Sequence, residues 1–128
     1  MFEDKQTAIE TFFKTNVTEV ALVFENAPTP DADEFIRIAV LFGTSKRMQI
    51  GGGAYRHPGI VAVQIFQREG VGINRGVELA DVVSTAFRDK VNSGVNYQVP
   101  YVTKFPNAYE GWYQVQVSIP FYIDEVTI

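Results

Sequence analysis

Residues 48–87 constrain the fold more than any other part of the chain, because the hydrophobic period changes within them. The segment reads MQIGGGAYRHPGIVAVQIFQREGVGINRGVELADVVSTAF. Apolar and polar side chains alternate over residues 60–67, which predicts a strand. After the glycines at 70–72, an apolar stripe recurs every three or four residues over 75–91 and predicts an amphipathic helix. The segment between the first glycines and the strand, 43–59, is predicted to be a hinged loop.

The remaining patterns complete an α+β arrangement. Helical periodicity marks residues 2–15, and strand patterns mark residues 20–24, 35–42, 95–105 and 112–119. The strand at 35–42 is apolar on both parities apart from Arg37, which predicts a central strand covered on both faces or nearly so. We predict one domain over 1–128, with an antiparallel or mixed sheet and two helices packed on one face. Polar amides should line the opposite face, from Gln64, Gln114 and Gln116.

Composition excludes several classes of function. The 128 residues include no cysteine, so disulfides and thiolate chemistry are ruled out. A net charge of −4 with scattered basic residues disfavours tight binding to nucleic acid. The acidic start of the chain does not resemble a signal peptide, and no apolar run has the length of a membrane span. We therefore expect a soluble protein that is not secreted.

Each candidate chemical motif lacks a necessary part. The glycines at 70–76 are spaced GxGxxxG, one residue longer than a dinucleotide fingerprint, and no acidic residue follows the next strand. Gly51-Gly52-Gly53 is not followed by the Lys and hydroxyl of a phosphate loop. His57 is the only histidine and, beside Pro58, is predicted at the surface. The acidic pairs are interpreted as solubility charges, so no catalytic, cofactor or metal site is predicted, and the chain is not expected to be an enzyme.

Two segments remain as candidate contact surfaces. The loop at 43–59 carries the densest basic cluster, and it is either a solvated loop or one that orders when a neighbouring subunit docks. Pro120 should mark a sheet edge or the end of the last strand. After it, the apolar residues from Phe121 onward either continue a strand at a sheet edge, covered by the first helix, or form an arm on an adjacent subunit.

The order of these features resembles the tail terminator family of long-tailed bacteriophages over nearly the whole chain. The residues that carry the resemblance are Glu25-Asn26 before a proline loop, Phe35–Ile38, the passage Gly51–Gly59, the strand Val61–Phe66, Gly70-Val71-Gly72 and Leu79-Ala80-Asp81. The turn Arg68-Glu69 departs from the pattern, since relatives commonly have a proline there.

The resemblance implies a homo-oligomeric ring, expected to be a hexamer, at the head-proximal end of the tail. Such a ring binds the last tail tube subunits, stops tube polymerisation and offers a surface to the head-completion or connector proteins. It belongs to the virion, is assembled in the host cytoplasm, makes no membrane contact, and meets duplex DNA only in transit through its channel.

A closed ring needs two different contact patches on each subunit. The predicted assembly residues are Arg47, Gly51, Gly52, Gly53, Tyr55 and Arg56 in the loop, with Phe121 and Tyr122 at the C-terminal edge. Two alternatives stay open. One is a head-completion or stopper ring protein of the head–tail connector, and the other is a small ligand-binding or hydrolytic α+β domain that uses the turn at 70–76.

Overall fold

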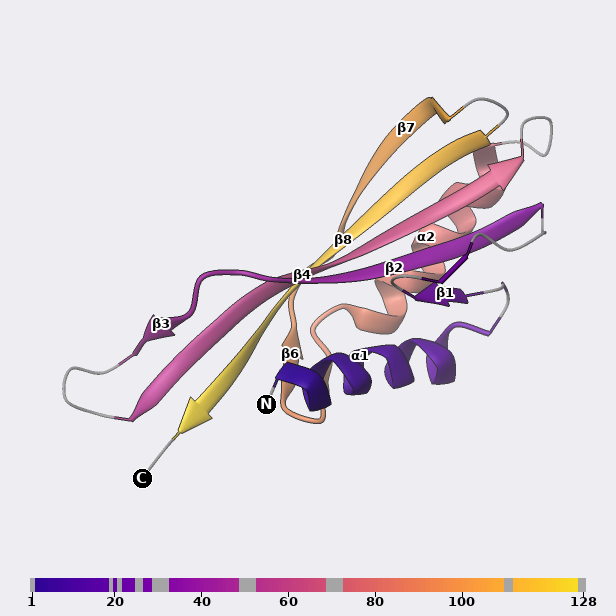
Figure 1. Ribbon diagram of the computed structural model, residues 1–128. Helices are drawn as coiled ribbons and strands as arrows, with labels where there is room; N and C mark the ends of the chain where they lie inside the picture. Colours follow the sequence, from indigo (N-terminus) through magenta and orange to yellow (C-terminus); the bar gives the residue numbers. More distant parts are fainter. Residues whose placement is uncertain are drawn as a thin grey trace.

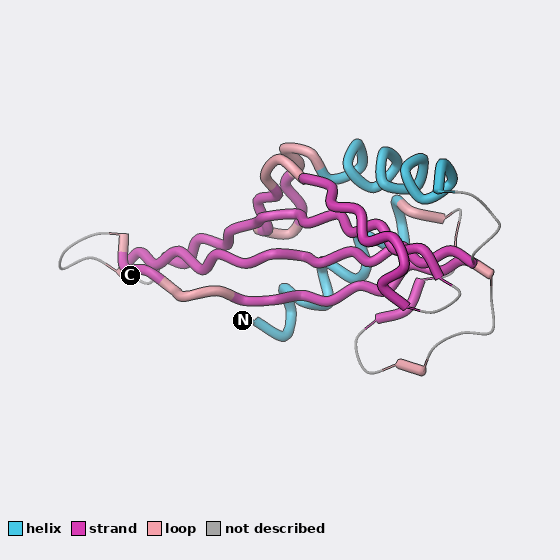
Figure 2. The backbone as a smooth tube through the Cα atoms, turned by 90° about the horizontal axis from the view of Figure 1, so that it is seen from above, coloured by secondary structure: helices cyan, strands magenta, loops and turns pink. Residues whose placement is uncertain are grey.

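The computed structural model describes residues 2–18, 20, 22–24, 27–28, 33–48, 53–68, 73–109 and 112–126, with the backbone alone for 73–74 and 105–109. Two helices, α1 (Phe2–Asn16) and α2 (Ile73–Phe87), lie on one face of a curled sheet (Figures 1 and 2). The predicted α+β class, with a mixed sheet and both helices on one face, is confirmed. Neither described helix is long and apolar enough to cross a membrane.

The sheet is built on two 15-residue strands. The described strands are β1 (Leu22–Phe24), β2 (Glu34–Phe42), β3 (Lys46–Arg47), β4 (Ala54–Arg68), β5 (Val91–Asn92), β6 (Val95–Tyr97), β7 (Tyr101–Tyr109) and β8 (Trp112–Val126). Strands β4 and β8 are antiparallel along their whole length. Strand β4 is flanked by β3 and then β2, and β8 is flanked by β7 and then β6. Only β1 and β2 pair in parallel among the described strands.

Both prolines of the long strands lie where the flanking strand changes. Pro58 accepts a hydrogen bond from the Gly43 backbone N–H at 2.8 Å, in the interval between β2 and β3. Pro120 accepts one from the Gln98 N–H at 2.8 Å, close to the interval between β6 and β7. Because proline has no N–H to donate, these interruptions of the ladder are the positions that tolerate it. Pro120 therefore lies inside β8 and does not end the strand, contrary to the prediction.

Strand parity separates a large core from a small one. The helix-facing side chains of β2, β4 and β8 pack against Ile9 and Phe13 of α1 and against Val83 and Phe87 of α2. On the other face, Gln64 of β4 lies directly opposite Gln116 of β8, as the alternation predicts. A second cluster at the far end of that face contains Val23, Phe35, Phe66 and, partly buried, Trp112.

Several predicted boundaries are wrong for local reasons. Helix α2 ends at Phe87, because Asp89 adopts a positive φ of 54°. Ser93 and Gly94, with φ of 52° and 82°, form a two-residue hairpin turn between β5 and β6. Strand β2 is not covered on both faces at its end, since Leu41 is 56% exposed.

Tyr97 makes the stability of the two-helix core depend on pH in the alkaline range. Its ring stacks on Phe12 and meets Phe87 edge-on, its side chain is 3% exposed, and its hydroxyl has no partner among the described residues. Burial raises the pKa of Tyr97 well above its usual 10.0, so only the unfolded chain loses this proton as the pH passes 10. We therefore expect the free energy of unfolding to fall above pH 10, by up to about 1.4 kcal/mol per pH unit.

Urea unfolding between pH 7 and 11 measures this effect. Tyr97→Phe should remove its share of the slope and change stability at pH 7 by less than about 1 kcal/mol, because the hydroxyl that it deletes is unpaired. Tyr101→Phe is the matched control, since Tyr101 is 53% exposed. Equal slopes for the wild type and Tyr97→Phe would contradict the assignment.

Candidate assembly surface

The long strands extend beyond the helices as a three-stranded projection. It consists of residues 46–47 of β3, 54–57 of β4 and 123–126 of β8, and we call it the arm (Figures 1 and 2). The predicted loop at 43–59 is therefore wrong over its second half, which is strand. Of the predicted assembly residues, the arm holds Arg47, Tyr55 and Arg56, and Tyr122 lies at its base. Gly53 immediately precedes β4, and Gly51 and Gly52 lie outside the described residues.

One face of the arm carries a paired guanidinium. Arg56 lies opposite Asp124 in the register and donates two hydrogen bonds to its carboxylate, Nε to Oδ1 at 2.8 Å and Nη2 to Oδ2 at 3.0 Å. The guanidinium also lies 4.1 Å from the centre of the Tyr122 ring. The hydrogen bonds from Arg56 hold the pKa of Asp124 below its usual 3.8. Asp124 is therefore more than the solubility charge expected from the sequence.

Arg56→Gln tests that cause. We expect the Asp124 pKa to return towards 3.8, because the charge-assisted hydrogen bonds are lost. Because the folded-state pKa of Asp124 is lowered, the ion pair stabilises the folded chain at pH values above the ordinary pKa of 3.8. This stabilisation is lost as the pH falls through the lowered pKa. NMR titration of the Asp124 carboxyl carbon measures the shift. Lys46→Gln is the control, because Lys46 is the cross-strand neighbour of Arg56. It should leave the pKa of Asp124 unchanged.

The other face is organised around His57. The residue is buried, with 8% of its surface exposed, so the predicted surface imidazole is wrong. The ring nitrogens Nδ1 and Nε2 lie 2.6 Å from Ser45 Oγ and 2.9 Å from Glu125 Oε1. Phe2 of α1 packs edge-on against the ring. His57 thereby ties the segment before β3, the end of β8 and the start of α1 to one strand.

The Ser45–His57–Glu125 series also defines what this face could do chemically. A hydroxyl, an imidazole and a carboxylate in hydrogen-bonded series are the groups that hydrolases use to move a proton. A hydrolytic function would therefore have to be tested here with Ser45→Ala. At the glycine turn over residues 70–76, residues 70–72 lie outside the described residues. Nearby, Arg75 of α2 donates from Nε to Glu34 Oε2 at 3.3 Å, which links α2 to the sheet. Gln67 Nε2 donates to the same oxygen at 3.2 Å, from β4 to β2.

Aromatic rings fill the base of the arm. Phe42 packs edge-on against Phe2 and Phe121, with ring centres 4.9 Å and 6.1 Å apart. Phe121 is 1% exposed and belongs to the helix-side core. The C-terminal segment does continue as a strand, but β8 lies between β4 and β6 as far as Ile123, so Phe121 and Tyr122 are not at a sheet edge. Phe121 thus has no exposed surface to offer a neighbour, whereas its neighbour Tyr122 faces the opposite side.

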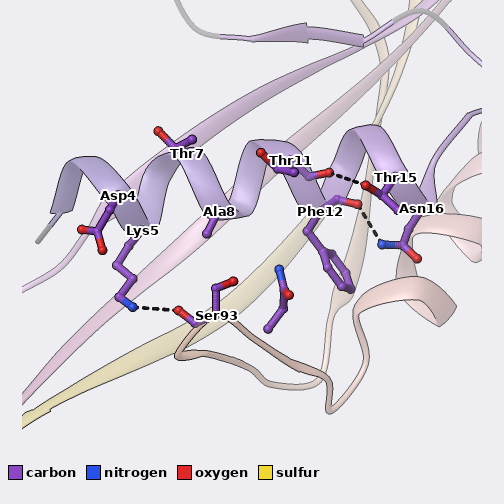
Figure 3. A pocket seen from close by; sticks show the side chains of 10 residues that line it. Asp4, Lys5, Thr7, Ala8, Thr11, Phe12, Thr15, Asn16 and Ser93 are labelled. Carbon is purple, nitrogen blue, oxygen red and sulfur yellow. Dashed lines mark hydrogen bonds between the residues drawn. The ribbon is translucent and has the colours of Figure 1, made fainter.

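Two open grooves border α1. One, of about 590 Å³, runs between α1 and the β5–β6 turn, where Lys5 Nζ donates to the Ser93 carbonyl at 2.7 Å (Figure 3). The other, of about 830 Å³, lies between the start of α1 and the end of β8. Its lining residues are Glu3, Asp4, Lys5, Thr7, Asp124 and Glu125. We call this second one the acidic groove, because carboxylates dominate its lining.

Sequence reasoning missed the acidic side of the arm. The signal was present: the strand alternation continues past Pro120, with Phe121 and Ile123 buried and Asp124 exposed. Continuation of the strand past Pro120 was one of the two predicted alternatives, but no local pattern indicates that residues 124 and 125 pair with Arg56 and His57 of the basic cluster.

Comparison with known proteins agrees with this architecture. A family model described as "Phage tail terminator protein" matches residues 5–121. One solved structure, which carries no functional name, is similar over 96% of this chain and 97% of its own, with a TM-score of 0.68 and 14% identity. At that identity the likeness shows the fold alone. No curated protein matches the sequence.

Proposed function

The chain belongs to the phage tail terminator family, and from this membership we propose that it forms a ring on the head-proximal end of the tail tube. The ring ends tube polymerisation and provides the surface on which the head joins the tail. The family match over residues 5–121 is the observation that carries the proposal. In this proposal, the protein is a virion structural protein that contacts copies of itself, the tube protein and a head-completion protein.

The arm supports the proposal because a ring needs two unlike patches per subunit. Head-to-tail contacts close only when one patch of each copy fits a different patch of the next. The arm is a long element outside the helix-covered body, and its two sides carry different side chains. We retain Arg47, Gly51, Gly52, Gly53, Tyr55, Arg56 and Tyr122 as proposed contact residues. Phe121 acts indirectly, by supporting the strand that presents Tyr122.

Deletion of the gene in its phage context tests the proposal. Without a terminator, tube subunits have nothing to halt their addition, so we expect tails of abnormal length that fail to join heads. Electron microscopy of lysates gives the length distribution, and plasmid-borne wild type should restore it. Tails of normal length without heads would instead favour a stopper of the head–tail connector. A complete absence of tails would contradict both.

The hydrolytic alternative is tested by one substitution. Ser45→Ala removes the hydroxyl from the Ser45–His57–Glu125 series without changing a charge. If the protein acts only through assembly, complementation by Ser45→Ala should restore normal tails. Loss of function with unchanged folding would favour chemistry at this site.

A further inference from the structure

The arm has two unpaired edges. Strand β3 is hydrogen-bonded to β4 alone among the described strands. On the other side, β6 pairs with β8 only as far as Ile123, so no described strand flanks Asp124–Val126. Exposed edges of this kind accept another strand, and natural proteins commonly cover or blunt them. No described strand of the same subunit pairs with either edge of the arm.

The two edges carry opposite charge. The β3 edge presents Lys46 and Arg47, both exposed, with no ion pair to a described residue. The β8 edge borders the acidic groove, where carboxylates of α1 and β8 lie on both sides. Opposite charges favour contact between unlike edges, and like charges disfavour contact between two copies of the same edge. The charge pattern therefore favours head-to-tail association over a two-fold dimer.

We propose that the arms of neighbouring copies pair edge to edge, the β3 edge of one copy against the Asp124–Val126 edge and acidic groove of the next. Strands β3 and β8 run parallel, since both are antiparallel to β4. If the ring axis is parallel to the arms, β8 of one copy and β3 of the next therefore also run parallel, and a single β-sheet continues from copy to copy. The inference rests on the proposed ring and specifies its subunit contact.

Disulfide trapping tests the contact, because the chain has no cysteine of its own. Met48 and Val126 are 49% and 70% exposed and flank Ala54 at the same level of the arm. The double variant Met48→Cys with Val126→Cys keeps every charge. In tails purified from complemented phage and then oxidised, we expect it to give a ladder of linked copies on non-reducing gels. Each single variant should stay monomeric, and a mixture of the two should give only dimers.

Charge reversal supplies the second measurement. Lys46→Glu and Arg47→Glu are added to the Met48→Cys, Val126→Cys variant. They should reduce the disulfide-linked fraction of the protein by roughly tenfold or more, because an acidic β3 edge then faces the acidic groove. When this charge-reversed variant is mixed with a second cysteine variant that carries Glu3→Lys and Asp4→Lys, disulfide linkage between the two should be restored. The double variant Met48→Cys with Thr85→Cys, on the exposed face of α2, is the control and should not form a ladder.

Other outcomes would overturn the inference. Dimers from a single-cysteine variant alone would show a two-fold contact. A disulfide-linked product that contains one copy of this protein and one tube subunit would place the arm on the tube. Tails of normal length without a ladder would refute this contact and leave the proposed function standing. If deletion of the gene left tails unchanged, the proposed function itself would fail.

Discussion

Phe121→Ala is expected to lower the free energy of unfolding by about 3–5 kcal/mol, the usual cost of removing a fully buried aromatic side chain. The ring is 1% exposed and packs over β4 beside Phe42. Its removal leaves a cavity between the central strands and separates the base of the arm from the helix-covered core. Urea unfolding followed by the fluorescence of Trp112, the only tryptophan, measures the loss.

Tyr122→Ala is the matched control, one residue along the same strand. Tyr122 points to the other face and its contact is with Arg56, so we expect a loss of about 1 kcal/mol or less. Both variants should complement poorly, but for different reasons. Tyr122→Ala should fold normally and complement poorly, whereas Phe121→Ala should fail through instability. Similar small losses for both would mean that Phe121 is not a core residue.

Gly59→Ala is the second large effect that we expect, with a loss of about 1–3 kcal/mol from overpacking. A Cβ at this position would lie 2.6 Å from the Leu41 carbonyl oxygen and against the Phe121 ring. The ring could tilt, but the oxygen belongs to the neighbouring strand, so β2 and β4 would have to separate. Thermal unfolding would record the loss.

Ile60→Ala controls for the position in the strand, because Ile60 lies next to Gly59 and is 37% exposed on the helix-free face. It should cost less than Gly59→Ala, although it removes most of an apolar side chain and Gly59→Ala only adds one methyl group. Combining Gly59→Ala with Phe121→Leu should recover part of the loss, since the smaller side chain frees the space of the ring. No recovery would assign the whole cost to the Leu41 carbonyl.

The sequence by itself determined the fold class and most elements, because periodicity reports which faces are buried. Helix α1 begins and ends within one residue of its prediction, and Val61, Val63 and Ile65 face the helices as their alternation indicates. The family was also recognisable from the order of these elements. Local patterns suffice where a face is buried by its own period.

Only the tertiary structure decided what the two candidate surfaces are. The glycines and prolines at 43–59 and at Pro120 predict interruptions, yet β4 and β8 run through Pro58 and Pro120 because their flanking strands change there. Residues 56 and 124 are far apart in sequence, so no local pattern predicts their ion pair. Pairing between distant strands depends on which strands become neighbours, and that choice is made by the packing of the whole sheet.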